Sequence, residues 1–472
     1  MHRLWSLNDL CRATKGQFVG EAPKGYVGGI SIDSRSILPG EAFFAIKGKR
    51  CDGHDYVVDV VQKKASLIVI DKQKSASIGR LFVPVLLVDD VLAALHKLAV
   101  VARLRSKARI IAITGSVGKT TTKEMLKFAL SSYGKTHVCA DSYNNHIGVP
   151  LTLARMPDDA DFGIFELGMN HAGELRSLTQ LVRPHIAVIT NIFPVHLGNF
   201  SGIDAIASAK AEIFEGLEKN GSVVLNRDNG YFEFLQDRSR AMGIKKVYSF
   251  GESCISDFQL LKVKESSEKS WMTARIQDKT IKVRILAPGK HMVHNILLTL
   301  GIVSFFSADI AKAIKNLSEF QPKEGRGKRY KLALESGYFT LIDESYNANP
   351  ASMQAAIEVL AKIAPHEKGR RIAVLGDMCE MGERSDFFHA NLSQTLLSHK
   401  ITHVWLSGIH MRMLKEALSE NIDIKYCKNV DDLLALIRSS LVVGDVVVVK
   451  SSQASNFQHI VKSLLQEFKI LP

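Results

Sequence analysis

The sequence has few cysteines and no paired ones. Its 472 residues include six cysteines, and no two of them form a Cys-x-x-Cys pair. Paired, regularly spaced cysteines build disulfide frameworks and structural zinc sites, so the sequence predicts neither and is typical of a reducing compartment. The six are Cys11, Cys51, Cys139, Cys254, Cys379 and Cys427.

Long apolar runs are also missing. No run reaches the roughly 18 residues that a membrane-spanning helix needs. The first 16 residues, MHRLWSLNDLCRATKG, have the pattern of an amphipathic helix and lack the apolar core of a signal peptide. We therefore expect a cytoplasmic globular protein without a membrane span.

The chain lacks a concentrated basic segment, although its formal net charge is +13. A basic protein attracts phosphate backbones. Here, however, lysines and arginines are spread over the whole chain. We expect solvated surface charge and no nucleic-acid partner. An anionic small substrate also fits the charge.

The pattern of strand-like and helical segments divides the chain into three zones. Residues 1–105 combine short strand-like segments such as AFFAIKG with a helical tail. Residues 106–327 start with the strand ARIIAIT and continue with FGIFEL, HIAVIT and SVVLN, separated by helical stretches. Residues 328–472 alternate FTLID, RRIAVLG, THVWLSG and DVVVVK with helices such as ASMQAAIEVLAKIA. This alternation predicts an α/β protein of three domains, with parallel sheets covered by helices on both faces.

The segment ITGSVGKTTTKE (113–124) contains an irregular phosphate-binding loop. The strict pattern G-x-x-x-x-G-K-[ST] requires a glycine where this chain has Ile113, and its upstream glycine is Gly115. The segment nevertheless joins a strand to a helix, whose first backbone N–H groups can cradle phosphate oxygens. Lys119 would reach the β- and γ-phosphates, and the Thr120 hydroxyl would bind Mg²⁺. We favour a nucleotide site over an ordinary strand-to-helix turn.

Further candidates follow later strands. Glu166 ends the strand FGIFEL, and His196 follows HIAVIT. Ligands of open parallel sheets bind beyond the carboxyl ends of the strands, so these residues could converge on the loop. Oxygen ligands suit Mg²⁺, whereas His196 alone could equally be a packed loop histidine. Lys210, taken alone, would be an exposed lysine of the helix GIDAIASAKAEIFEGL.

These residues lie in short sequence blocks that are similar to those of the ATP-dependent Mur ligase family, and the resemblance covers essentially the whole chain. The SYNANP and ELGMNHAGE blocks point to the branch that adds D-alanyl-D-alanine. In that family the loop reads T-G-[ST]-x-G-K-[TS] and does not need the first glycine. The blocks are DSRSILPGEAFFAIKGKRCDGHDY (33–56), TGSVGKTTTKEM (114–125), NNHIGVPLTL (144–153), ELGMNHAGE (166–174), AKAEIF (209–214), LNRDN (225–229), DESYNANPASM (343–353) and LGDMCEMGE (375–383).

The resemblance implies roles for the metal and catalytic residues. Thr120 and Glu166 would hold the Mg²⁺ that bridges the ATP phosphates, and His196 would serve a second Mg²⁺. Lys210 matches the family lysine that is carbamylated, which turns an ammonium into an oxygen ligand for metal. Lys119, His196 and Lys210 are then the catalytic residues.

The resemblance also implies the substrate contacts. Asn295 matches the adenine contact and Asp343 the ribose-binding acid. Either Arg326 or Arg329 matches the hinge arginine that reaches ATP, and spacing does not choose between them. Ser34 and Arg35 resemble part of the site for the uridine diphosphate. The loop residues on ATP would be Thr114, Gly115, Ser116, Val117, Gly118, Lys119 and Thr120.

The domains would accordingly be a UDP-binding domain (1–105), a central P-loop ATPase domain (106–327) and a C-terminal Rossmann-like domain (328–472) that binds the dipeptide. The implied activity is ATP-dependent ligation of D-alanyl-D-alanine to UDP-N-acetylmuramoyl-tripeptide through an acyl phosphate, by a monomer. It would serve peptidoglycan synthesis, and through it cell shape and division.

Some alternatives stay open at this stage. One is a sibling Mur ligase or a folylpolyglutamate-synthase-like enzyme with another acceptor; another is a nucleic-acid-stimulated P-loop ATPase. Near the end the family often has KGSR, whereas this chain has Lys450-Ser451-Ser452-Gln453. The missing arginine at Gln453 leaves the dipeptide contacts undefined.

Overall fold

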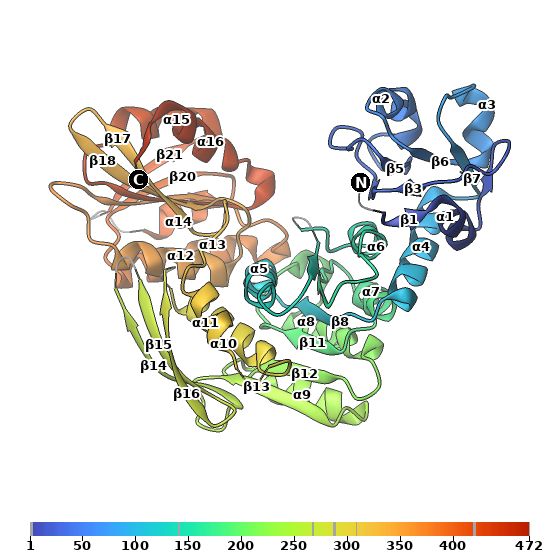
Figure 1. The fold of residues 1–472 in the computed structure, drawn as a ribbon. Helices are drawn as coiled ribbons and strands as arrows, with labels where there is room; N and C mark the ends of the chain where they lie inside the picture. Colours follow the sequence, from blue (N-terminus) through green and yellow to red (C-terminus); the bar gives the residue numbers. More distant parts are fainter. Residues whose placement is uncertain are drawn as a thin grey trace.

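The computed structural model describes residues 3–139, 142–266, 269–286, 289–307, 309–418 and 422–471. The chain forms three lobes in sequence order, and the central lobe joins the other two (Figure 1). Within these residues, no helix is both long enough and apolar enough to cross a membrane.

The N-terminal lobe is built on a small mixed sheet. Its strands, in spatial order, are β2 (Gln17–Phe18), β7 (Val85–Val88), β6 (Leu67–Asp71), β5 (Glu41–Phe44) and β4 (Gly29–Ser31). The helix predicted over residues 1–16 is shorter. Strand β1 (Trp5–Ser6) pairs with β3 (Tyr26–Val27), and α1 (Leu7–Thr14) begins only at Leu7. The Ser6 side chain caps α1 by accepting from the Asp9 N–H, which fixes this start.

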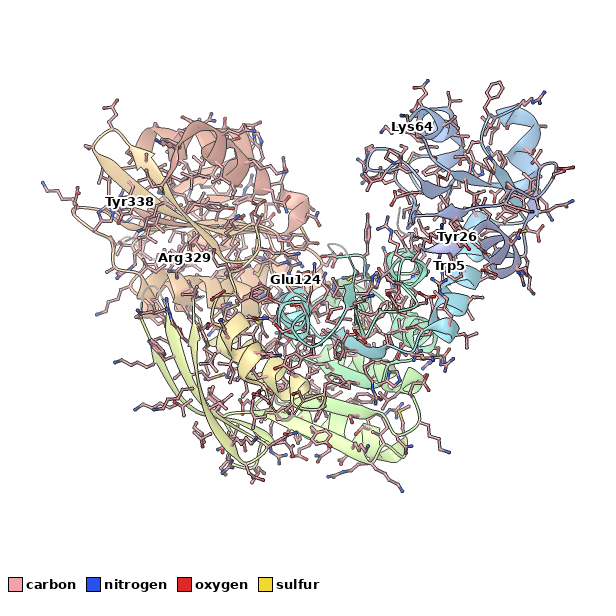
Figure 2. The ribbon with its side chains drawn as sticks, viewed as in Figure 1. Trp5, Tyr26, Lys64, Glu124, Arg329 and Tyr338 are labelled. Atoms are coloured by element: carbon pink, nitrogen blue, oxygen red, sulfur yellow. The ribbon has the colours of Figure 1, made fainter. Side chains whose placement is uncertain are left out.

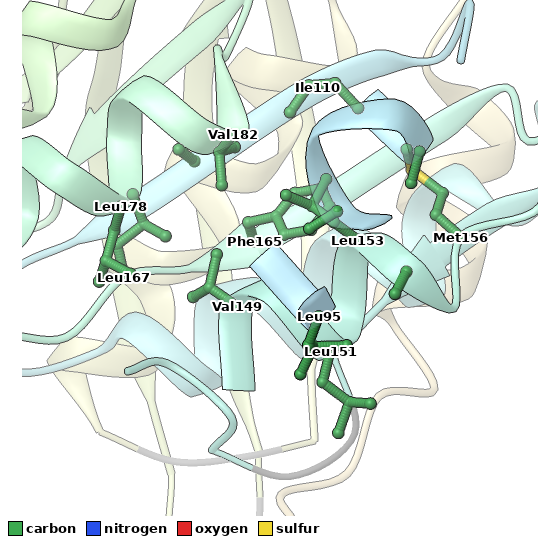
Figure 3. Packing of buried hydrophobic residues seen from close by; sticks show 14 of the residues in the cluster. Leu95, Ile110, Val149, Leu151, Leu153, Met156, Phe165, Leu167, Leu178 and Val182 are labelled. Atoms are coloured by element: carbon green, nitrogen blue, oxygen red, sulfur yellow. The ribbon is translucent and has the colours of Figure 1, made fainter. Parts of the chain in front are cut away.

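Helix α4 (Val91–Arg105) connects the first two lobes and packs on α6 (Gly148–Ala154) of the central lobe. Figure 3 shows Leu95 of α4 among side chains of α6, α7 (Glu174–Val182) and the central sheet. Trp5 lies at the same junction (Figure 2) and donates a 2.8 Å hydrogen bond from Nε1 to the Ala154 carbonyl. One hydrophobic core therefore runs from the N-terminal lobe into the central one.

The central lobe contains a twisted sheet with the phosphate-loop strand in its parallel part. In the part of the chain that the structure describes, its strands in spatial order are β16 (Lys279–Ile285), β15 (Ser270–Ile276), β14 (Phe258–Glu265), β13 (Lys246–Gly251), β12 (Ser222–Asn226), β11 (Ile186–Ile189), β8 (Arg109–Thr114), β10 (Phe162–Glu166) and β9 (Thr136–Val138).

The predicted parallel arrangement does not extend to one edge of this sheet. Strands β14, β15 and β16 form an antiparallel meander. Gln277 and Asp278, both with positive φ, form the tight turn between β15 and β16, so no helix is needed to reverse the chain. The alternating burial along β15 is the usual mark of a strand with one face on the core.

The C-terminal lobe is a second twisted sheet with helices on both faces. Helix α12 (Pro350–Lys362) and helix α13 (Ser385–Ser398) pack on one face, and α15 (Val430–Ser440) and α16 (Gln458–Glu467) on the other. The predicted parallel α/β arrangement is confirmed here, apart from antiparallel β17 and β23 at one edge. Its strands in spatial order are β21 (Asp423–Cys427), β20 (His403–Ser407), β19 (Arg371–Gly376), β22 (Val446–Lys450), β18 (Gly337–Glu344), β17 (Lys328–Leu334) and β23 (Ile470–Leu471).

Candidate active site

The phosphate-loop segment joins β8 to α5 (Lys119–Leu130). Ile113 is a fully buried strand residue in the hydrophobic core, so the missing glycine falls inside β8 and not in the loop. Gly115 has a φ of +145°, and a Cβ there would lie 1.9 Å from Thr190 Oγ1. The loop therefore needs its glycine at 115, where the backbone passes against the residue that follows β11.

The segment after β11 holds the loop in shape. The Val117 N–H donates to Asn191 Oδ1 at 2.9 Å, and the Thr190 hydroxyl donates to the Val117 carbonyl at 2.6 Å. Ser116 Oγ donates to the Phe193 carbonyl at 3.0 Å. These bonds order the loop without using the N–H groups at the start of α5, which stay available for an anion.

Lys119 lies inside this loop. Its Nζ donates a 2.7 Å hydrogen bond to the Gly115 carbonyl. Burial lowers the pKa of Lys119, partly offset by the Glu166 carboxylate. An incoming phosphate would supply the counter-charge that this partly buried ammonium needs.

Thr120 and Glu166 meet at the ends of α5 and β10. The Thr120 hydroxyl donates to Glu166 Oε2 at 2.7 Å, and the Asn144 amide donates to Glu166 Oε1 at 3.0 Å. Lys123, a fully buried lysine, lies 3.9 Å from Glu166 Oε2. A carboxylate and a hydroxyl at this spacing provide oxygen donors of the kind that Mg²⁺ prefers.

Lys210 is not the exposed lysine that its sequence alone suggests. It lies in α8 (Ile203–Ala211), is 2% exposed and lines the same cavity as Lys119. Among the described residues, no hydrogen bond or ion pair to its Nζ is seen. Burial, with a smaller contribution from Lys119, holds the pKa of Lys210 well below its usual value. A buried amine whose charged form is disfavoured therefore borders the same cavity as the phosphate loop.

His196 connects two lobes. Its Nδ1 contacts the Glu380 carboxylate of the C-terminal lobe, and the side chain also lines the cavity. His196 therefore combines the two features that the sequence offered as alternatives, a packed loop histidine and a residue at the ligand site. The ring is packed through one nitrogen and borders the cavity.

The hinge segment distinguishes the two arginine candidates. Arg326 lines the cavity, and its guanidinium lies 4.0 Å from the centre of the Tyr346 ring. Arg329 lies in β17, within the C-terminal sheet (Figure 2), and is not among the residues that line the cavity. Of the two, the structure brings only Arg326 to the site.

Asp343 lies at the hinge turn, and Asn295 lies beside the phosphate loop. Asp343 Oδ2 accepts from the Gly325 N–H at 2.6 Å, and Oδ1 accepts from the Ser345 hydroxyl at 2.6 Å. Burial raises the pKa of Asp343. Both carboxylate oxygens thus hold the hinge turn. Because Oδ1 also accepts from the Ser345 N–H at 3.1 Å, a ribose contact would use the second lone pair of Oδ2. Asn295, in α10 (Lys290–Val303), lines the cavity beside Gly118.

Ser34 and Arg35 lie elsewhere in the N-terminal lobe. Lys63 Nζ donates to the Ser34 carbonyl at 2.6 Å, and the exposed Arg35 pairs with Asp33 at 2.7 Å. Neither Ser34 nor Arg35 lines the cavity; residues 1–105 contribute Lys49, Arg50 and His96 instead. The basic run KGKR (47–50) is the feature of the sequence that could have indicated this contribution.

All three lobes border one cavity of about 1710 Å³. The pocket for a single small ligand usually measures about 300–1,000 Å³, so this cavity can hold more than one substrate. The C-terminal lobe contributes Gln453 and the buried Lys450, whose Nζ donates to the Asn347 carbonyl at 2.9 Å. Ser451 is fully buried and is not among the lining residues. The sequence pattern alone does not indicate a role for Lys450.

The side chains that line the cavity suit a nucleotide bound together with Mg²⁺. The loop offers the N–H groups at the start of α5 and a partly buried lysine, Lys119. Thr120 and Glu166 offer oxygen donors next to them. The buried amine of Lys210 lies in the same cavity. This arrangement suits transfer of a phosphoryl group with its charge balanced by lysine and metal.

Comparison with known proteins agrees with this geometry. Three family models match in order: "Mur ligase family, catalytic domain" over residues 26–103, "Mur ligase middle domain" over 113–303, and "Mur ligase, glutamate ligase domain" over 328–453. The UDP-N-acetylmuramoyl-tripeptide–D-alanyl-D-alanine ligase of Rickettsia prowazekii is 33% identical over 432 residues, which are 92% of this chain and 94% of that protein.

Solved structures are similar over the whole chain. MurF from Acinetobacter baumannii has a TM-score of 0.84 at 27% identity, covering 98% of this chain and 99% of that one. MurF from Thermotoga maritima in complex with ADP has a TM-score of 0.76 at 24% identity, covering 93% and 97%. The second likeness concerns the fold alone.

Proposed function

This chain belongs to the Mur ligase family and is an ATP-dependent ligase; we propose that it joins D-alanyl-D-alanine to UDP-N-acetylmuramoyl-tripeptide and converts ATP to ADP and phosphate. One observation carries the proposal: Lys119, the Thr120–Glu166 pair and Lys210 line a single cavity that three lobes enclose. The Rickettsia prowazekii relative, whose name gives these two substrates, matches over nearly its full length.

The reaction requires an activated carboxyl group. A free carboxylate repels an attacking amine, and oxide is a poor leaving group. Transfer of the γ-phosphate to the carboxylate of the tripeptide gives an acyl phosphate. The dipeptide amine then attacks its carbonyl carbon, and the tetrahedral intermediate expels phosphate. Positioning and charge compensation are the main tasks of such a site.

The phosphate loop is proposed to bind ATP through residues 114–120. The N–H groups at the start of α5 would contact phosphate oxygens, and Lys119 would move from the Gly115 carbonyl to the β- and γ-phosphates. Asn295 is proposed to contact adenine and Asp343 the ribose. Arg326, which the cavity includes, is proposed to reach the phosphates.

Two Mg²⁺ ions are proposed to be held by Thr120, Glu166, His196 and Lys210. When bound, the ions offset the charge of the phosphoryl group in transfer. Lys210 would serve as a ligand after carbamylation, because a neutral amine reacts with carbon dioxide and the product is an anionic oxygen donor. The lowered pKa of Lys210 supports this role, since it raises the neutral fraction.

The lobes are proposed to divide the substrates. Lys49 and Arg50, together with Ser34 and Arg35, would bind the uridine diphosphate end, because arginine pairs well with diphosphate. The wall that contains Lys450 and Gln453 would bind the dipeptide. All of these residues belong to one chain, so we propose a monomer. Its place would be the cytoplasm, where it would supply peptidoglycan precursors for cell shape and division.

A phosphate-release assay tests the function. Purified protein, ATP and UDP-N-acetylmuramoyl-tripeptide should release phosphate and form product in equal amounts when D-alanyl-D-alanine is added. Lys119→Ala should lose roughly 100-fold or more of this rate while staying folded. Product formation with glutamate or a diamino acid instead would favour a sibling or folylpolyglutamate-synthase-like ligase. Stimulation by DNA or RNA alone would favour a nucleic-acid-dependent ATPase.

A further inference from the structure

The loop that carries His196 meets the C-terminal lobe at one small contact. Its side chain reaches the Glu380 carboxylate through Nδ1, and the Gly198 N–H donates to the Glu380 carbonyl at 3.2 Å. Both His196 (φ +54°) and Glu380 (φ +64°) have left-handed backbone conformations, which are uncommon for residues other than glycine. Such conformations persist where the surrounding structure holds them, and they concentrate at functional sites.

Close packing of two glycines sets the approach of the lobes. A Cβ on Gly382 would lie 3.1 Å from Gly198 Cα, and Gly382 itself has a φ of +61°. Any larger side chain there would separate the two loops. The contact between His196 and Glu380 therefore depends on the lobes being together.

The contact also determines which ring nitrogen is available. A carboxylate only accepts hydrogen bonds, so Nδ1 must carry the proton that it donates to Glu380. In the neutral ring, Nε2 then has a free lone pair. Within the described chain no hydrogen bond to Nε2 is seen, and His196 lines the cavity. A carboxylate that fixes the tautomer of a histidine in this way prepares the ring to bind a metal.

We propose that Glu380 is a positioning residue that holds His196 as the Nδ1–H tautomer with Nε2 available to the cavity, so that contact between the central and C-terminal lobes completes the phosphate site. The identity of the metal nucleotide in this inference rests on the proposed function. The tautomer of the His196 ring does not depend on that function.

The tautomer can be measured directly in the metal-free protein. Long-range ¹H–¹⁵N correlation spectra, with the His196 signals identified from a His196→Gln variant, should show the Nδ1–H form. Glu380→Ala should shift the ring toward the Nε2–H form, and Glu380→Gln should restore the original form because its amide oxygen still accepts. Glu383→Ala, a neighbouring exposed carboxylate, is the matched control and should change nothing.

Mn²⁺ binding in the presence of ADP provides the second measurement. Glu380→Ala and Gly382→Ala should each weaken it, by roughly 10-fold or more for the first. An unchanged tautomer in Glu380→Ala, or unchanged Mn²⁺ affinity in both variants, would overturn the proposal. Absence of ligation by the wild-type protein would instead contradict the proposed function, and it would leave the tautomer result standing.

Discussion

The Thr120 hydroxyl donates a 2.7 Å hydrogen bond to Glu166 Oε2, across 46 residues of sequence. The parallel pairing of β8 with β10 produces this contact, because it places the end of β10 beside the loop that follows β8. The Asn144 amide donates to the other oxygen of Glu166 at 3.0 Å. The carboxylate is therefore oriented before any metal binds.

Glu166→Gln should reduce ATP-dependent phosphate release by roughly 100-fold or more, because the amide cannot supply the negative charge that Mg²⁺ requires. Mn²⁺ binding with ADP should weaken in parallel. Glu233→Gln changes an exposed carboxylate on α9 (Phe232–Ala241) and should leave both measurements unaltered. Normal phosphate release by folded Glu166→Gln would exclude Glu166 as the metal ligand.

Lys210→Ala should lose most ligase activity, and short carboxylates such as formate or propionate should restore part of it by occupying the space of the proposed carbamate. In the wild-type protein, ¹³C-bicarbonate should give a carbamate signal that the variant lacks. Lys219→Ala, at an exposed lysine, is the control. Full activity of Lys210→Ala would show that the buried amine is not part of the reaction.

Arg326→Lys should raise the KM for ATP roughly 5- to 30-fold, equivalent to about 1–2 kcal/mol, because lysine lacks the planar guanidinium that lies over Tyr346. Arg329→Lys should leave that KM nearly unchanged, since Arg329 lies outside the cavity. Steady-state kinetics with both variants shows which of the two arginines affects ATP binding. A larger effect at Arg329 would reverse the assignment.

His137 should make stability depend on pH. Burial lowers its pKa from 6.5 to about 4, and its Nε2 lies 2.8 Å from the Thr152 carbonyl. The unfolded chain binds the proton at a higher pH than the folded one. The free energy of unfolding should therefore fall as the pH drops from about 6.5 to about 4, by at most about 3 kcal/mol from this residue.

Urea unfolding of wild type and His137→Gln between pH 7 and pH 4.5 measures this effect. Glutamine keeps a donor for the Thr152 carbonyl but does not bind a proton in this range. The wild type should lose more stability than the variant on acidification. Parallel curves for the two proteins would show that His137 does not titrate as described.

The sequence by itself determined the local structure of the site. A strand running into Gly115, Gly118 and Lys119 predicts a phosphate loop wherever it occurs, because the backbone conformations and the helix N-terminus are local properties. The strand–helix alternation likewise predicted the C-terminal sheet. The meander β14–β16 was missed because its strands are joined by short connections rather than helices.

Only the tertiary structure decided which distant residues meet. Lys210 looks like a surface lysine in its helix. It is a buried amine because α8 packs into the hydrophobic core and Lys210 lines the cavity. The choice of Arg326 over Arg329, the cavity-lining Lys49, Arg50 and Lys450, and the pairing of His196 with Glu380 all depend on how the lobes approach one another. Spacing along a chain carries no information on such contacts, since sheet pairing and lobe packing set them.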